Sequence, residues 1–166
     1  SWTISDDGTV YTFKLRSGVK FHDGSALNAS AVKFNFDRML DDGHPYHDTG
    51  PFPLSFFFSA ITDVSVVDDM TVKFTLNAPY APFLSNLAYP TGLIVSPEAV
   101  KKHGKDFGQN PSGTGAFKFA DWRSNEAVVV EANSNHWEGA PKLNAVVFRP
   151  ITAVSYTHLT LPTTLS

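Results

Sequence analysis

The chain has 166 residues, of which 42% are hydrophobic and 17% charged, so it holds enough apolar material to bury the core of one ordinary globular domain. Its formal net charge of -3 gives no basic surface for a phosphate backbone, and we therefore expect no nucleic-acid partner. The sequence contains no cysteine, which excludes disulfides and thiolate metal sites, and no apolar run in it is long enough to span a bilayer.

Two alternating runs, residues 2–5 and 9–16, open the chain and flank an Asp-Asp-Gly turn signal. This pattern predicts a β-hairpin. Phe21 follows between turn residues, and we expect its ring to enter the core. Asn28 can then cap a helix by accepting a hydrogen bond from a free N–H group. Because apolar residues recur at helical spacing behind this cap, a helix is predicted over residues 29–40.

The middle of the chain alternates between loops and short elements. Residues 41–51 concentrate glycine, proline and aspartate, which predicts a surface loop. Alternating residues 61–68 and 71–76 predict a second hairpin. A short helix over residues 83–88 and a brief buried strand over residues 92–95 are predicted next.

Two groups of apolar side chains in this region are predicted to lie inside. The phenylalanines after the surface loop are too apolar to be left in water, and we expect most of them to be buried: Phe52, Phe56, Phe57 and Phe58. The alternation of the second hairpin directs a further set inward: Val64, Val66, Val72, Phe74 and Leu76.

Residues 96–104 carry a full set of helix signals, with Ser96 as the cap, a proline at the first helical position and Gly104 as the stop. Residues 110–115 form a loop rich in turn residues. Three more strands are predicted after it, over residues 116–122, 127–132 and 144–150. The predicted elements therefore mix α and β structure.

Residues 154–166, which contain the run VSYTHLTLPTT, fit none of these patterns and resemble translated sequencing-adapter DNA. We expect residues 153–166 to be a non-native tail that packs on nothing. The chain opens without an initiator methionine or an apolar leader, so we expect an export signal upstream. We also expect a larger downstream part of the natural protein to be absent after a cut near Ala153.

Four segments together resemble one family, the extracytoplasmic solute-binding proteins that serve peptide, oligopeptide and nickel importers of the ATP-binding-cassette (ABC) type. The likeness covers roughly residues 1–152, in the family's order and spacing. The segments are YTFKLRSGVKFHDGSALNASAVKFNFDR, TVKFTLNAPYAPFLSNLA, NPSGTGAFKFADW and HWEGAPKLNAVVFRPI.

The resemblance implies an α/β fold, mixed α+β within this stretch, of the periplasmic-binding-protein-like class II. Residues 1–152 are then a partial N-terminal lobe, part of lobe I only. The implied function is capture of di- or oligopeptides outside the cytoplasmic membrane and delivery to the permease of an ABC transporter. The implied protein is a monomer, periplasmic or an extracytoplasmic lipoprotein, with neither catalysis nor a cofactor.

Other cargo remains open, since nickel, an oligosaccharide or another solute fits the same family. The resemblance implies that the charged anchors for the ends of a peptide lie mainly in the other lobe, so this chain would hold half a site at most. A secreted hydrolase is the alternative from another functional class.

No catalytic residue and no metal site are predicted. The aspartate pairs at 6/7, 41/42 and 68/69 fall in predicted turns, where aspartate bonds its own backbone, and no Gly-x-Ser-x-Gly elbow occurs. His44 and His47 lie among aspartates that could chelate a metal. We prefer a solvated acidic loop, because no cysteine supports these histidines and no helical face fixes them.

Five residues are candidate ligand contacts. Tyr46 and Tyr89 lie in proline-containing irregular segments, where a ring can stack on a ligand, although a partly buried tyrosine bonded to backbone is the alternative for each. Gly113, Thr114 and Gly115 form a loop that could cradle an anion. Because no Lys-Ser/Thr pair follows it and a strand, not a helix, comes next, a strand-entry turn is preferred over a nucleotide site. The family resemblance places this loop beside the cleft between lobes.

Overall fold

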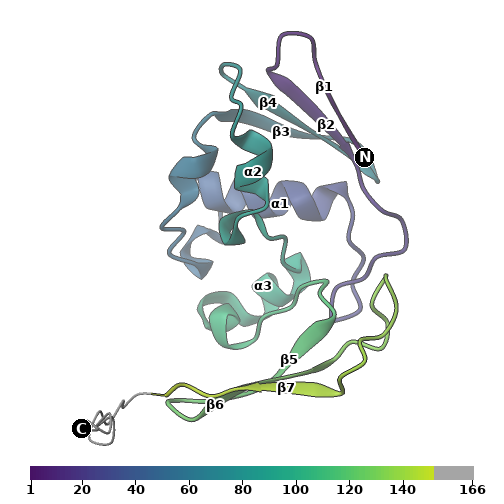
Figure 1. The fold of residues 1–166 in the computed structure, drawn as a ribbon. Helices are drawn as coiled ribbons and strands as arrows, with labels where there is room; N and C mark the ends of the chain where they lie inside the picture. Colours follow the sequence, from purple (N-terminus) through teal and green to yellow (C-terminus); the bar gives the residue numbers. More distant parts are fainter. Residues whose placement is uncertain (152–166) are drawn as a thin grey trace, which may run out of the picture.

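The computed structural model describes residues 1–151, so the predicted tail over residues 153–166 lies outside the described part of the chain. Its strands form two separate antiparallel sheets, one in the order β1-β2-β4-β3 and one in the order β5-β6-β7. Figure 1 shows the helices between them, with the four-stranded sheet above and the three-stranded sheet below. The mixed α and β content agrees with the sequence prediction.

Both predicted hairpins form the first sheet. Strands β1 (Trp2–Ile4) and β2 (Val10–Lys14) make the first hairpin, and β3 (Ile61–Asp68) and β4 (Thr71–Leu76) make the second. The hairpins join through β2 and β4, in which Phe13 pairs with Val72. This join places the buried residues of both hairpins on one face.

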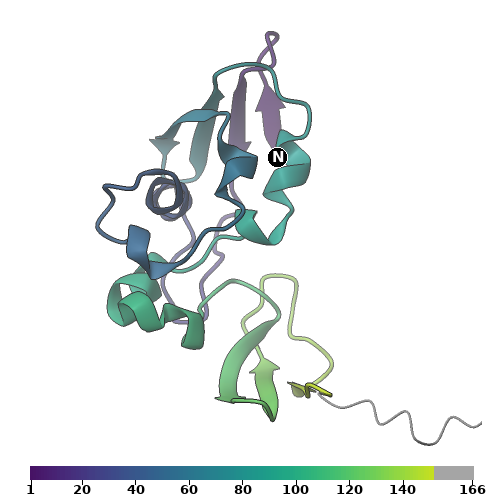
Figure 2. The same ribbon diagram turned by 90° about the vertical axis from the view of Figure 1, so that its left-hand side faces the viewer.

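Helix α1 (Ala29–Leu40) has the predicted bounds. The side chain of Asn28 accepts a hydrogen bond from the N–H of Ala31, which satisfies one of the free donors of the first turn. The helix packs against β3 and β4, and Figure 2 shows it nearly end-on beneath the sheet. Phe36 carries the contact, with ring centroids 5.2 Å from Phe58 and 4.9 Å from Phe74.

Short helical turns connect these elements. The expected surface loop contains η1 (His47–Thr49), and η2 (Ser55–Phe58) follows it. Helix α2 (Phe83–Leu87) confirms the predicted short helix, and η3 (Pro90–Gly92) comes directly after it. The phenylalanine cluster is less buried than predicted, because Phe58 is fully buried, Phe52 and Phe57 are half-buried, and Phe56 is 61% exposed.

Two further expectations are wrong. Residues 92–95 form no strand, and Leu93 is 66% exposed. The backbone of Val95 instead bonds to the side chain of Asn35, which replaces a neighbouring strand. Val66 is 40% exposed although Val64 is buried on the same strand, because β3 is the edge of the sheet and is irregular between Val66 and Asp68.

The second half of the chain follows the sequence closely. Helix α3 (Pro97–His103) has the predicted serine cap, with Ser96 accepting from the N–H of Ala99, and η4 (Gly104–Gln109) continues from it. The three predicted strands form the second sheet: β5 (Phe117–Arg123), β6 (Ala127–Ala132) and β7 (Ala145–Phe148). Within residues 1–151, no helix is both long enough and apolar enough to cross a membrane.

Candidate functional site

A hollow with a volume of about 470 Å³ lies over α1. Helix α1 provides its floor through Asn35, Arg38 and Met39. Residues 49–54 form one wall and residues 90–95 form the other. We call this hollow the α1 cavity. Its lining is mostly apolar with a few polar groups on the floor, the composition typical of small-molecule sites.

Asn35 fixes the second wall on the helix. Its buried amide donates to the carbonyl oxygens of Ala31 at 2.9 Å and Val95 at 2.8 Å, and its oxygen accepts from the N–H of Val95 at 3.3 Å. The amide therefore pairs with both backbone groups of Val95, as a neighbouring strand would. This contact holds the segment before α3 against the floor of the cavity.

Arg38 adds a positive charge to the floor of the α1 cavity. Its side chain is only 7% exposed, and Nη1 donates to the hydroxyl of Thr49 at 2.9 Å. Nη2 makes a longer contact of 3.4 Å with the oxygen of Asn35. Burial lowers the pKa of Arg38 to about 10, so the guanidinium still carries its charge at neutral pH.

The first wall is shaped around this guanidinium. The hydroxyl of Thr49 donates to the carbonyl oxygen of Tyr46 at 2.6 Å while it accepts from Arg38, which ties the loop to the helix. The ring of Phe52 lies 5.0 Å from the guanidinium carbon of Arg38, within the range of a cation–π contact. Phe52 has a φ of 37°, a conformation that non-glycine residues adopt at a cost in strain.

A second hollow of about 570 Å³ lies between α3 and the second sheet. It is larger, but several of its polar groups already bind neighbouring side chains. Asp23 accepts hydrogen bonds from the hydroxyls of Ser25 and Ser96, and Lys118 pairs with Glu131 at 2.9 Å. Burial would raise the pKa of Asp23, but hydrogen bonds from Ser25 and Ser96 outweigh that effect and hold the pKa below 3.8. We therefore interpret this hollow as a structural junction and favour the α1 cavity as the site.

The candidate loop of Gly113, Thr114 and Gly115 lies at this junction. The N–H of His22 donates to the carbonyl oxygen of Gly113 at 2.8 Å, and the imidazole of His22 lies 2.9 Å from the carbonyl oxygen of Gly115. The amide of Asn133 also donates to Gly115, at 3.1 Å. These bonds are those of a strand-entry turn, and the loop does not line the α1 cavity.

The two candidate tyrosines lie in different surroundings. The half-buried ring of Tyr46 packs on Phe34 with centroids 5.6 Å apart, in a small cluster with Val100. Tyr89 is 49% exposed and meets Phe57 edge-on at 5.3 Å. Tyr89 directly precedes the Pro90–Gly92 turn of the second wall, so it stands beside the cavity.

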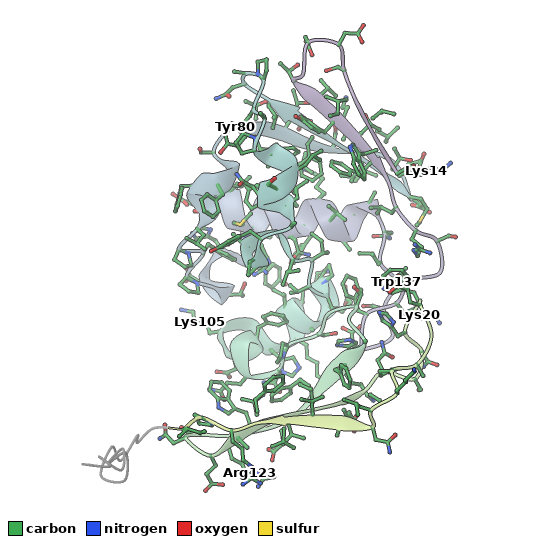
Figure 3. The ribbon with its side chains drawn as sticks, in the orientation of Figure 1. Lys14, Lys20, Tyr80, Lys105, Arg123 and Trp137 are labelled. Carbon is green, nitrogen blue, oxygen red and sulfur yellow. The ribbon has the colours of Figure 1, made fainter. Side chains whose placement is uncertain are left out.

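The histidines of the acidic loop, residues 41–51, bond to groups in the loop or in the adjoining end of α1. Nδ1 of His47 lies 2.9 Å from the carbonyl oxygen of Arg38, and Nε2 lies 3.5 Å from Asp42. Nδ1 of His44 accepts from the N–H of Tyr46 at 3.2 Å. Across the described residues, no three histidines, aspartates or glutamates gather in a way that could hold a metal. On the far side of this loop, Asp48 lies 3.5 Å from Lys105 of η4, which is labelled in Figure 3.

Comparison with known proteins identifies the family. The model described as bacterial extracellular solute-binding proteins, family 5 Middle, matches residues 1–161. This chain belongs to that family. A curated relative, the glutathione-binding protein GsiB of Pectobacterium atrosepticum, is 44% identical over 152 residues, which are 91% of this chain and 28% of the relative. The chain therefore spans about 28% of the length of the curated relatives it matches.

Solved structures share the fold. The periplasmic binding protein DppA of Helicobacter pylori, in complex with the peptide STSA, is 35% identical with a TM-score of 0.77 over 91% of this chain and 33% of that chain. NikZ of Campylobacter jejuni, in complex with Ni(L-His), is 30% identical with a TM-score of 0.78 over 91% of this chain and 29% of that chain. These matches confirm the predicted fold class, part of one lobe of a class II periplasmic binding protein.

Asn35 and Arg38, which line the α1 cavity, were not among the site residues predicted from the sequence. Both lie on α1 at positions that the apolar pattern leaves polar, three residues apart and therefore on one face of the helix. A polar pair beside the buried positions of Phe36 and Met39 was the available signal. That signal is weak, because polar pairs on a helix usually face solvent.

Proposed function

We propose that this chain is part of an extracytoplasmic receptor that binds a peptide-like solute and delivers it to the permease of an ABC importer. Family membership supports the proposal, together with relatives named for binding glutathione and a neighbour that holds the peptide STSA. We place the receptor in the periplasm or on the outer side of the membrane as a lipoprotein, and we expect it to act as a monomer without catalysis.

One observation carries the proposal for this part of the protein. The α1 cavity has the size and mostly apolar lining of a small-molecule site, and buried polar groups stand at its floor. We propose that these residues form one side of the binding site and that a second lobe closes over it. Closure would remove water from the solute, and the difference in contacts between open and closed states would set the affinity.

Among the residues predicted from the sequence, Tyr89 is best placed to touch the solute, because its exposed ring stands beside the second wall. Tyr46 remains a proposed contact from the other side, with its ring half-buried against Phe34. Gly113, Thr114 and Gly115 remain proposed lining of the interlobe cleft, although their backbone is engaged by His22.

A second cargo is favoured by one comparison, since the neighbour NikZ holds Ni(L-His). Isothermal titration calorimetry of the full-length protein with glutathione, the peptide STSA and Ni(L-His) distinguishes the two proposals. The peptide proposal predicts saturable binding of glutathione or STSA that exceeds any binding of Ni(L-His). Binding of Ni(L-His) alone would replace the peptide proposal with the nickel alternative.

A further inference from the structure

Among the described residues, Arg38 is a buried cation without an acidic partner. None of the ion pairs formed within residues 1–151 includes it, although its side chain is only 7% exposed. Within the same residues, Nε of Arg38 has no hydrogen-bond partner at all. A buried charge is costly unless it is paired, and Arg38 lacks a negatively charged group to balance its charge.

The guanidinium of Arg38 has N–H donors that its hydrogen bonds to Thr49 and Asn35 do not use. Arginine carries five N–H donors, and the two contacts of Arg38, to Thr49 and to Asn35, leave a second hydrogen on each of Nη1 and Nη2. Arg38 is also one of the residues that line the α1 cavity. The Thr49 and Asn35 contacts hold the guanidinium in place before any solute arrives.

The cavity lining indicates which group would complement this cation. Among the described residues that line the α1 cavity, Arg38 is the only charged side chain. One positive charge in an otherwise neutral, mostly apolar hollow matches a single negative charge better than a dianionic phosphate, and it disfavours a bare metal cation. A planar guanidinium also matches the geometry of a carboxylate.

We propose that Arg38 receives a carboxylate of the bound solute at the floor of the α1 cavity. This inference rests on the proposed function and narrows it, because it makes the solute an acid and places one charged anchor in this lobe. The family resemblance led us to expect such anchors mainly in the other lobe. Asn35 and Thr49 act as positioning residues for Arg38 in this arrangement.

The test uses the full-length protein with three probes: glutathione and its two monoamides, each of which lacks one carboxylate. We expect one monoamide to bind at least about tenfold more weakly than glutathione, because it leaves Arg38 unpaired. In Arg38→Gln, the difference between that monoamide and glutathione should disappear. Arg38→Lys, which keeps a charge but not the planar donors, should retain a reduced preference for glutathione.

Arg123→Gln is the matched control. Arg123 lies on β5 at the far end of the molecule from the α1 cavity, as Figure 3 shows, and it pairs with Asp121 at 2.8 Å. The Arg123→Gln variant should bind the three probes with the same affinities as the wild type. A role of Arg38 in stability alone would weaken all three probes by the same factor and leave the discrimination intact, which would overturn the inference.

A second measurement needs no variant. In the wild type, the Nε–H NMR signal of Arg38 should shift when glutathione is added. It should stay unchanged when the more weakly binding monoamide is added. Equal binding of all three probes would overturn this inference while leaving the proposed function standing. Failure to bind glutathione and STSA alike would instead remove the proposed function, and the inference with it.

Discussion

Nε2 of His22 lies 2.9 Å from the carbonyl oxygen of Gly115, which is 93 residues further along the chain. Nδ1 of the same ring accepts from the N–H of Gly113 at 3.3 Å. A ring that accepts at Nδ1 and donates at Nε2 is neutral imidazole with its proton on Nε2. One side chain thus joins the segment before α1 to the segment that enters the second sheet.

Replacing this histidine should loosen the junction. We expect His22→Ala to lower the free energy of unfolding of the full-length protein by about 1–2 kcal/mol, since two hydrogen bonds to backbone are lost. Urea denaturation measures the change. His136→Ala is the control, because within the described residues the ring of His136 accepts a single long hydrogen bond, 3.4 Å from the N–H of Glu138. Equal stability of His22→Ala and the wild type would contradict this role.

Acid should weaken the same junction through Asp23. Its folded-state pKa is held below 3.8 by serine hydrogen bonds that outweigh burial, so the ionised carboxylate stabilises the fold fully above that value. The contribution is lost as pH falls through the lowered pKa. We therefore expect the stability difference between wild type and Asp23→Asn to shrink as pH drops below 3.8. A difference that stays constant down to about pH 2 would show that the charge is unimportant.

Gly92 lets the second wall of the α1 cavity turn close to α2. A Cβ atom there would overlap the carbonyl oxygen of Leu87, a backbone atom that cannot easily move. We expect Gly92→Ala to cost about 1–3 kcal/mol by overpacking and to weaken solute binding. Gly108→Ala, where a Cβ atom meets open space, should change neither. Thermal unfolding measures the stability of both variants, and calorimetry measures their solute binding. Stability and binding of Gly92→Ala equal to those of the wild type would contradict this account of the wall.

Residues 1–151 should not form a complete site by themselves. The α1 cavity is open, and in the proposed receptor a second lobe supplies the contacts that close it. We expect this part of the chain, prepared alone, to bind glutathione more weakly than the micromolar range. Calorimetry that shows micromolar affinity would refute the half-site interpretation.

Local signals predicted most of the fold. The bounds of α1 and α3 follow from the caps of Asn28 and Ser96, because a capped helix is specified by neighbours in sequence. The strand predicted at residues 92–95 does not form, since the backbone of Val95 bonds to the side chain of Asn35, 60 residues earlier in the chain. No local pattern reports a contact of that kind.

The candidate site was less predictable than the fold. Tyr89 could be chosen from its irregular segment, but the importance of Arg38 depends on burial and on which loops surround it. Those loops come from residues 49–54 and 90–95, which only the tertiary structure brings together over α1. The family-signature segment around His22 extends to Arg38, so it builds the junction through His22 and also supplies the floor of the cavity through Asn35 and Arg38.

The central claim is that the α1 cavity holds part of a peptide-like solute, and a crystal structure of the full-length protein with glutathione tests it most directly. We predict the solute against the two walls, with a carboxylate within hydrogen-bond distance of Arg38. Glutathione bound elsewhere, with the α1 cavity filled only by water, would contradict the account.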